Sequence, residues 1–310
     1  MFSNFIVNFW REMTVRRVRS EIPDTHIKRL YRKAILIAIS GNILLALGKA
    51  FVAWISDSSA VFSDAANSFS DSLYSILMGI GLYLSQRPAD ENHPQGHGRF
   101  EPFVSLIIAI GMTGAGVTAV WQAIQRFLGQ AIIIQPGWPT AILICAAIIK
   151  VAMYLSVRDI GNKSYSPAIR ASAQDNLADI LTSLAALAGV WGSRLIHSSL
   201  DPVAGVIVGL WIFRVTWVTI RENLGYLAGR GASDELTQKI VDVAYEVEGV
   251  QKVHRVVADY VGQRVRVEMH IYVDGEIPLK DAHEIGEAVK DKVEALLEVD
   301  LAFIHVEPPT

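Results

Sequence analysis

Long apolar runs with few polar positions fill the chain from about residue 34 to residue 222. A helix that crosses a membrane needs roughly 20 mostly apolar residues. Because lipid offers the backbone no hydrogen-bond partners, each of these runs is expected to be a helix. The pattern therefore predicts six transmembrane helices, at about 34–56, 60–86, 100–128, 136–158, 169–195 and 200–222.

The pattern changes after the last run, where charged residues become frequent and apolar residues recur with helical or alternating spacing. Gly249 ends the first helical stretch, and a Gly262-Gln263 turn separates two alternating stretches. The expected elements are a helix at 234–248, strands at 253–260 and 265–273, a helix at 279–297 and a strand at 301–306. This α-β-β-α-β order predicts a ferredoxin-like domain, with helices on one face of the sheet and the other face free to meet a partner.

Composition and charge place these two regions relative to a membrane. The 51% hydrophobic and 19% charged content fits a chain that lies largely in a lipid bilayer, and a net charge of −3 gives no basic excess for binding nucleic acid. Lys and Arg gather before the first apolar run and in the loops after the second and fourth runs. The positive-inside rule then places both termini in the cytoplasm. We expect a multi-pass protein of the inner or plasma membrane, with a basic cytoplasmic segment (1–33), a six-helix domain (34–222) and a cytoplasmic domain (223–310).

Acidic and amide side chains interrupt two of the apolar runs at a spacing of four residues. Asn67 precedes Asp71 in the second run, and Asp175 precedes Asp179 in the fifth. This spacing places each pair on one face of its helix. A lone charge at membrane depth costs at least ~2.5–3.5 kcal/mol, so several carboxylates together indicate a polar cavity with a compensating cation or protons. The alternative is that they lie near helix ends or hydrogen-bond between helices, and the role of Asp64 stays open.

The donor atoms of these four side chains indicate which ion they would bind. Carboxylate and amide oxygens favour hard cations such as Mn²⁺, Mg²⁺ or Fe²⁺, whereas zinc sites usually contain imidazole or thiolate. Mg²⁺ rarely binds in an all-protein cage, which favours Mn²⁺ and leaves Fe²⁺ as the alternative. Clustered carboxylates also bind protons, so metal and protons compete for one site. That competition is the physical requirement for antiport.

The paired four-residue repeats, the six spans and the α-β-β-α-β tail resemble the cation diffusion facilitator family over nearly the whole chain. The resemblance implies a homodimeric metal/proton antiporter whose transport site consists of Asn67, Asp71, Asp175 and Asp179. Zinc members of the family usually have a histidine at the position of Asp175. Asn67 together with an aspartate pair on the fifth helix resembles the manganese branch instead, although export of Fe²⁺ or Zn²⁺ stays open.

The resemblance also implies metal sites outside the membrane. Asp90, His93 and His97 match a family site in the loop after the second helix, where a solvated polar loop is the alternative. In the C-terminal domain, a metal site that would hold structural Zn²⁺ or Mn²⁺ and join the domains is expected at His254, His270, His283, His305 and Glu307. Glu307 replaces the more usual aspartate.

Two other functional classes could use acidic residues within a membrane. An intramembrane aspartyl protease would activate water with two acids, but its Gly-x-Gly-Asp element is missing because Leu82 follows Gly79-Ile80-Gly81. A passive metal channel or a membrane-bound metal sensor could use the same ligands without proton exchange. The expectation is therefore a secondary active transporter that exports a divalent transition metal, Mn²⁺ in preference to others, and not an enzyme.

Overall fold

The computed structural model describes residues 25–56, 59–128, 138–195, 200–262 and 264–309. The chain forms two compact units, one reaching to Arg221 and the other beginning at Glu222.

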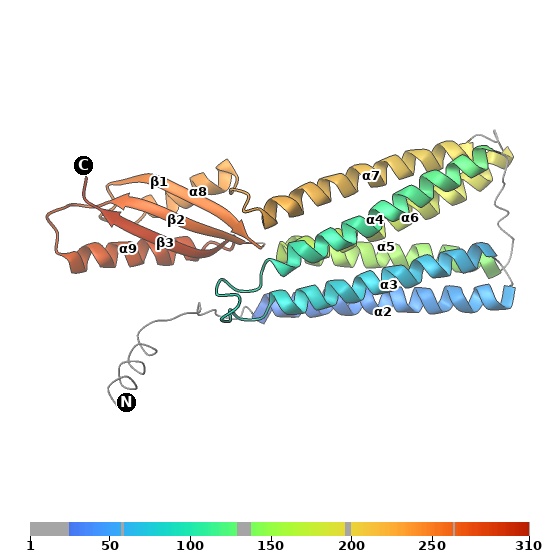
Figure 1. Cartoon of the computed structure of the whole chain (residues 1–310), viewed down its shortest axis with the longest axis horizontal. Coiled ribbons are helices and arrows are strands. Elements are labelled where there is room, and N and C mark those ends of the chain that lie inside the picture. Colours follow the sequence, from blue (N-terminus) through green and yellow to red (C-terminus); the bar gives the residue numbers. More distant parts are fainter. Residues whose placement is uncertain (1–24, 57–58, 129–137, 196–199, 263, 310) are drawn as a thin grey trace, which may run out of the picture. The chain divides into compact units, whose positions relative to one another are not determined.

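Among the described residues, the first unit consists of six long helices, the last of which continues into the residues of the second unit (Figure 1): α2 (Thr25–Ser56), α3 (Ser59–Ser85), α4 (Phe100–Phe127), α5 (Trp138–Ser164), α6 (Pro167–Leu195) and α7 (Leu200–Leu227). Helix α2 packs against α3 and α5, while α4 packs against α3 and α6. Helices α5 and α6 are neighbours, and α3 also contacts α6. Helix α7 approaches α4 closely at Gly205, where an added Cβ would lie 2.9 Å from the Cβ of Ala123. Small residues at such contacts let helices pack in a membrane without a hydrophobic driving force.

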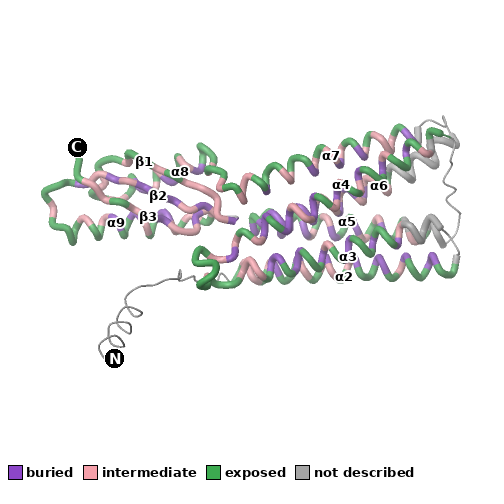
Figure 2. The backbone as a smooth tube through the Cα atoms, in the orientation of Figure 1, coloured by how far each residue is buried: buried purple, intermediate pink, exposed green. Residues whose placement is uncertain are grey.

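The first unit exposes large apolar side chains and buries several polar ones. Large apolar side chains such as Leu44, Leu47 and Trp54 of α2 are exposed, whereas Lys49 on the same helix is buried. Figure 2 shows that exposed positions follow the outer sides of α2 and α7. Outward apolar and inward polar side chains are expected when lipid, not water, surrounds the helices.

Length and apolar composition alone identify three membrane-spanning candidates among the described helices, Thr25–Ile55, Phe100–Gln125 and Pro202–Leu227. Helices α3, α5 and α6 carry the polar and charged side chains of the candidate site, including Asp71, Lys150 and Asp179.

The helices also continue past several of the expected boundaries. Helix α2 is already helical at Thr25, α5 continues to Ser164 and α7 continues to Leu227. Hydropathy falls where a helix leaves lipid, but its backbone hydrogen bonds persist in water. An exposed pair on the extension of α5, with Lys163 Nζ 2.6 Å from Asp159 Oδ2, has the i, i+4 spacing that supports such a segment.

The second unit has the expected α-β-β-α-β order. It contains α8 (Asp234–Tyr245), β1 (Lys252–Val261), β2 (Arg264–Tyr272), α9 (Leu279–Glu294) and β3 (Val299–Glu307). Ser233 caps α8 by accepting a 3.2 Å hydrogen bond from the Leu236 backbone N–H. Gly262, at a φ of 74°, allows the turn between β1 and β2. Strand β2 lies between β1, which is antiparallel to it, and β3, which is parallel.

One face of this sheet forms the hydrophobic core. Val265, Val267, Met269 and Ile271 alternate along β2 and are fully buried with side chains of α8 and α9. The intervening positions, including His270, point to the opposite face. The fold is therefore a helical membrane domain followed by a ferredoxin-like C-terminal domain, as expected from the sequence.

Candidate metal sites

A cluster of three carboxylates lies between two helices of the membrane domain. Asp71 belongs to α3, whereas Asp175 and Asp179 lie one turn apart on α6. One carboxylate oxygen from each lies within 4.8 Å of the other two, a spacing that one metal ion can bridge. Asp71 is buried, and the two aspartates of α6 are half-buried. Asn67 lies one turn before Asp71 on α3 and is exposed.

A buried lysine that the sequence analysis did not single out joins this cluster. Lys150 of α5 donates hydrogen bonds to Asp71 Oδ2 at 2.9 Å and to Asp179 Oδ2 at 2.5 Å. Its ammonium thus connects α3 and α6 through the carboxylates that are candidate metal ligands. The signal was present in the sequence, because a lysine inside an apolar run carries the same cost as an aspartate there.

A second buried lysine accounts for Asp64. Lys49 of α2 places its Nζ 2.7 Å from Asp64 Oδ2 and donates a 2.9 Å hydrogen bond to Ser68 Oγ. Asp64 therefore forms an ion pair between α2 and α3. This pair gives Asp64 a compensating charge that does not depend on a metal.

Further polar contacts fix α3 near Asp71. Asn42 of α2 donates a 2.7 Å hydrogen bond from Nδ2 to Ser75 Oγ, and Ser75 donates one of 2.9 Å to the Asp71 backbone oxygen. Asn42 and Ser75 are both buried. Such hydrogen bonds between helices hold the backbone of a site in register.

A second group lies in the loop between α3 and α4, where ligand atoms of Asp90, His93 and His97 lie within 4.8 Å of one another. Asp90 Oδ1 accepts hydrogen bonds from the backbone N–H groups of His93 at 2.7 Å and Asn92 at 3.0 Å. The His93 contact, more than the others, lowers the pKa of Asp90 below its ordinary value, so this exposed carboxylate stays ionised near neutral pH.

The orientation of His97 suits it for binding a cation. Its ring is buried, and its Nδ1 lies 3.1 Å from the Pro88 carbonyl oxygen, which can only accept a hydrogen bond. In the neutral ring, this contact favours the tautomer with the proton on Nδ1 and the lone pair on Nε2. Nε2 lies 3.4 Å from Asp90 Oδ2. A histidine fixed in this way by a carbonyl oxygen is common at metal sites.

A third group lies on the open face of the C-terminal sheet, with one residue on each strand. Ligand atoms of His254, His270 and Glu307 lie within 4.8 Å of one another. The register of β1 against β2 shifts between Val253 and Arg255, so His254 occupies an irregularity in the strand. His270 Nδ1 lies 2.8 Å from Glu307 Oε1.

The remaining two histidines of the expected C-terminal site have different positions. His305 is exposed, with Nε2 3.3 Å from Glu307 Oε1, and so lies beside the group. His283 lies on α9, which covers the other face of the sheet, and it interacts electrostatically with Glu287 of the same helix. The hydrogen bond from His270, and then the nearby His254, lower the pKa of Glu307.

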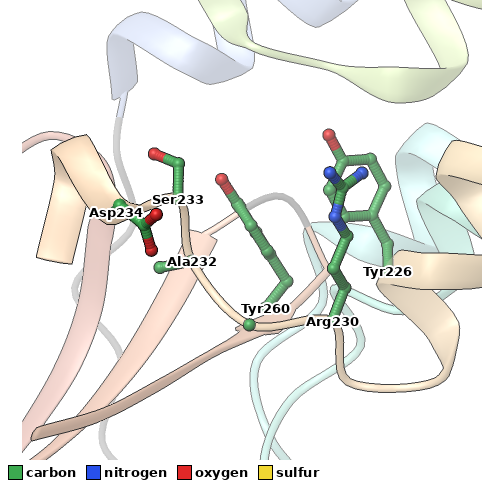
Figure 3. A pocket seen from close by; sticks show the side chains of 7 residues that line it. Tyr226, Arg230, Ala232, Ser233, Asp234 and Tyr260 are labelled. Atoms are coloured by element: carbon green, nitrogen blue, oxygen red, sulfur yellow. The ribbon is translucent and has the colours of Figure 1, made fainter.

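A hollow of about 420 Å³ lies in the second unit, apart from these three groups. Figure 3 shows the side chains of Tyr226, Arg230 and Tyr260 along it. The two tyrosine rings meet edge to face with centroids 4.9 Å apart. Asp234 supplies the one carboxylate among the residues that line this hollow, so it has too few donors for a metal.

Comparison with known proteins covers nearly the whole chain. The family model of the cation efflux transmembrane domain matches residues 35–228, and that of the cation efflux protein cytoplasmic domain matches residues 232–309. An uncharacterised transporter of Methanocaldococcus jannaschii is 32% identical over 90% of this chain and 99% of that protein. The manganese efflux system protein MneP of Bacillus subtilis is 29% identical over 91% of this chain and 97% of that protein.

A magnetosome protein is also similar. MamM of Paramagnetospirillum magneticum is 30% identical over 83% of this chain and 81% of that protein. A solved cadmium form of the C-terminal domain of MamM is similar to a part of this chain. The match covers 25% of this chain and 98% of the solved chain at 35% identity, with a TM-score of 0.24. The family matches confirm the resemblance inferred from the sequence motifs. The chain therefore belongs to the cation efflux family, the cation diffusion facilitators, and is an integral membrane transporter of metal cations.

Proposed function

We propose that this protein exports a divalent transition metal, Mn²⁺ in preference to others, from the cytoplasm in exchange for protons. The observation that carries the proposal is the meeting of the Asp71, Asp175 and Asp179 carboxylates between α3 and α6. Clustered charges inside a membrane domain need a cation or protons to compensate them. A transported metal is such a cation.

The donor atoms support Mn²⁺ as the substrate. Within the described part of the chain, the group that contains Asp71, Asp175 and Asp179 includes neither histidine nor cysteine. Oxygen-only sites favour hard cations, and Mn²⁺ enters protein cages more readily than Mg²⁺ does. Asn67, one turn before Asp71, would add an amide oxygen to this donor set. The similarity to a manganese efflux protein points the same way.

Proton exchange follows from the same carboxylates, because metal and protons would compete for their oxygens. In the state open to the cytoplasm, metal would displace protons. In the state open to the other side, protons would displace metal. Each ligand then shifts the equilibrium between the two states of the carrier only by the difference in its affinity for them.

The two histidine-containing groups outside the membrane would bind further metal. Two imidazoles and a carboxylate form a donor set that suits Zn²⁺ as well as Mn²⁺, both in the loop at Asp90 and on the C-terminal sheet at His270. We place both termini in the cytoplasm of a cell whose inner or plasma membrane holds the protein. The C-terminal domain would join two copies in a homodimer, since its family model is that of a cytoplasmic domain of cation efflux proteins.

Metal flux into vesicles tests this function. The full chain is reconstituted with a metal-sensitive dye inside, and uptake of Mn²⁺, Fe²⁺, Zn²⁺ and Mg²⁺ is compared. We expect Mn²⁺ to move fastest. Asp71→Asn and Asp179→Asn should each lower flux at least about 100-fold, since even residues that only support metal ligands are worth 10–100-fold.

The matched control is Asp159→Asn, which neutralises an exposed aspartate of α5 paired with Lys163. Its flux should equal that of the wild type. If Mn²⁺ flux persists in both Asp71→Asn and Asp179→Asn, transport does not use this cluster. If Fe²⁺ or Zn²⁺ moves faster than Mn²⁺, the protein is an exporter of that metal.

A further inference from the structure

Lys150 raises a question that the proposed function leaves open, namely what compensates the aspartates when no metal is bound. Its side chain is buried within the membrane domain, with Nζ 2.9 Å from Asp71 Oδ2 and 2.5 Å from Asp179 Oδ2. These two carboxylates come from different helices and both belong to the candidate transport site. The inference below rests on the proposed function of that site.

The lysine and a metal ion would need the same space. A metal bound to Asp71 and Asp179 would lie about 2.0–2.6 Å from their oxygens. The ammonium already contacts one oxygen of each carboxylate at hydrogen-bond distance. A metal that takes these two Oδ2 oxygens would break at least one of these contacts, and Lys150 would withdraw from the oxygens that the metal takes.

Formal charge supports an exchange between the ammonium and the metal. When all three aspartates are ionised, they and the ammonium together carry a net charge of −2, which a single divalent cation neutralises. Without the lysine, the empty site would hold three carboxylates with no counter-charge hydrogen-bonded to them. Buried charges without a partner are strongly destabilising, so the empty carrier would change conformation with difficulty.

The second buried lysine does not occupy an equivalent position. Lys49 forms its ion pair with Asp64 and its hydrogen bond with Ser68, neither of which belongs to the three-carboxylate group. Of the lysines that the structure describes in the membrane domain, Lys150 is thus the one in contact with candidate ligands.

We propose that Lys150 is the built-in counter-cation of the transport site. Its ammonium occupies the ligand oxygens of Asp71 and Asp179 in the metal-free carrier, and the entering divalent metal displaces it. On the release side the ammonium returns to these oxygens and helps the metal to leave. Lys150 therefore lowers metal affinity and raises turnover.

The test measures affinity and turnover separately in Lys150→Met. Mn²⁺ binding is measured by calorimetry on the purified full chain in a His97→Ala/His270→Ala background, which weakens binding at the two groups outside the membrane. The transport-site signal is the binding that Asp179→Asn removes. We expect Lys150→Met to lower its Kd at least about tenfold, because a competing charge is gone. Maximal flux in vesicles should fall by at least a similar factor.

Two matched variants serve as controls for Lys150→Met. Lys150→Arg keeps the charge and should hold Kd within about threefold of the wild type. Lys163→Met removes an exposed lysine of the same helix and should change neither quantity. If Lys150→Met does not yield a folded protein, Lys150→Gln keeps a hydrogen-bond donor without the charge and should show the same tighter binding.

The outcomes separate this inference from the proposed function. A folded Lys150→Met or Lys150→Gln variant that binds Mn²⁺ with unchanged or weaker affinity would overturn the counter-cation role, since a merely structural lysine gives that result. Manganese binding and flux that both survive Asp179→Asn would instead refute the transport site itself.

Discussion

Asp175 is the residue at which a change of donor atom should alter the metal that is transported. Asp175→His replaces a hard anionic oxygen with an imidazole nitrogen in a group otherwise made of carboxylates. Zinc favours such nitrogen donors, whereas Mn²⁺ depends on several oxygens. We expect the ratio of zinc flux to manganese flux in vesicles to rise at least about tenfold, a change of roughly 1.4 kcal/mol in relative transition-state energy.

Asp175→Asn is the control, because it removes the same charge without adding a nitrogen ligand. Its zinc-to-manganese ratio should stay near that of the wild type while both fluxes fall. An equal rise in the Asn and His variants would show that lost charge, not the donor atom, sets the ratio.

The residues of the candidate site differed in how readily the sequence revealed them. Asp71, Asp175 and Asp179 stand out because acids at helical spacing inside apolar runs have few structural explanations. Lys150 obeys the same energetic argument, but its partners lie on α3 and α6, so no spacing within its own helix indicates the contact. Pairings between helices depend on their packing, which one sequence does not specify.

At the scale of elements, the open face of the C-terminal sheet should bind zinc. The isolated segment from Glu222 retains its own hydrophobic core, and a ligand that binds only the folded state stabilises it by mass action. Zinc at about 100 times its Kd should raise the melting temperature by roughly 10–20 °C. His270→Ala should abolish this shift.

His283→Ala is the matched control, since His283 lies on α9, which covers the other face of the sheet. The zinc shift should persist in this variant. Loss of the shift in His283→Ala would mean that metal binding brings α9 into the site, as the family resemblance implied. No shift in the wild-type segment would show that these histidines do not bind zinc under these conditions.

An ion pair between α8 and the segment before β3 should make the same domain sensitive to acid. Lys239 Nζ lies 3.0 Å from Glu298 Oε1, and this hydrogen bond lowers the pKa of Glu298. A lowered folded-state pKa means that the pair stabilises the domain above the unfolded value of about 4.3. The contribution is lost as the pH falls through the folded value. Glu298→Gln should therefore melt below the wild type at pH 7.

The difference in melting temperature between Glu298→Gln and the wild type should shrink towards zero as the pH is lowered to about 3. It is measured by thermal unfolding of the metal-free segment across this pH range. Glu276→Gln, at an exposed turn, serves as the control and should follow the wild type throughout. A difference that stays constant with pH would contradict the charge-based origin.

The sequence pattern predicted the boundaries of the strands more closely than those of the membrane helices. Alternation located β1, β2 and β3 closely, because one face of the sheet is buried in the core and the other is not. The membrane helices were harder to delimit. An apolar run indicates the part of a helix that lies in lipid, whereas α5 and α7 continue as helices beyond their apolar runs.

At the scale of the whole molecule, proton exchange distinguishes the antiporter from a passive channel. Vesicles containing the full chain and equal Mn²⁺ on both sides are given a pH gradient. An antiporter should accumulate Mn²⁺ on the more acidic side against its own gradient, because protons leaving that side drive metal the other way. A dye that reports Mn²⁺ inside acidic vesicles measures this accumulation.

The free energy of the pH gradient sets the size of the expected accumulation. For exchange of two protons per metal ion, a gradient of one pH unit corresponds to about 2.7 kcal/mol, which could support roughly a 100-fold difference in Mn²⁺ concentration. One proton per metal would give about tenfold, at zero membrane potential, so the measured ratio also reports the stoichiometry. Nigericin with equal potassium on both sides collapses the pH gradient and should abolish accumulation. A channel through the same carboxylates would accumulate nothing, since a pH gradient cannot drive metal that moves without protons.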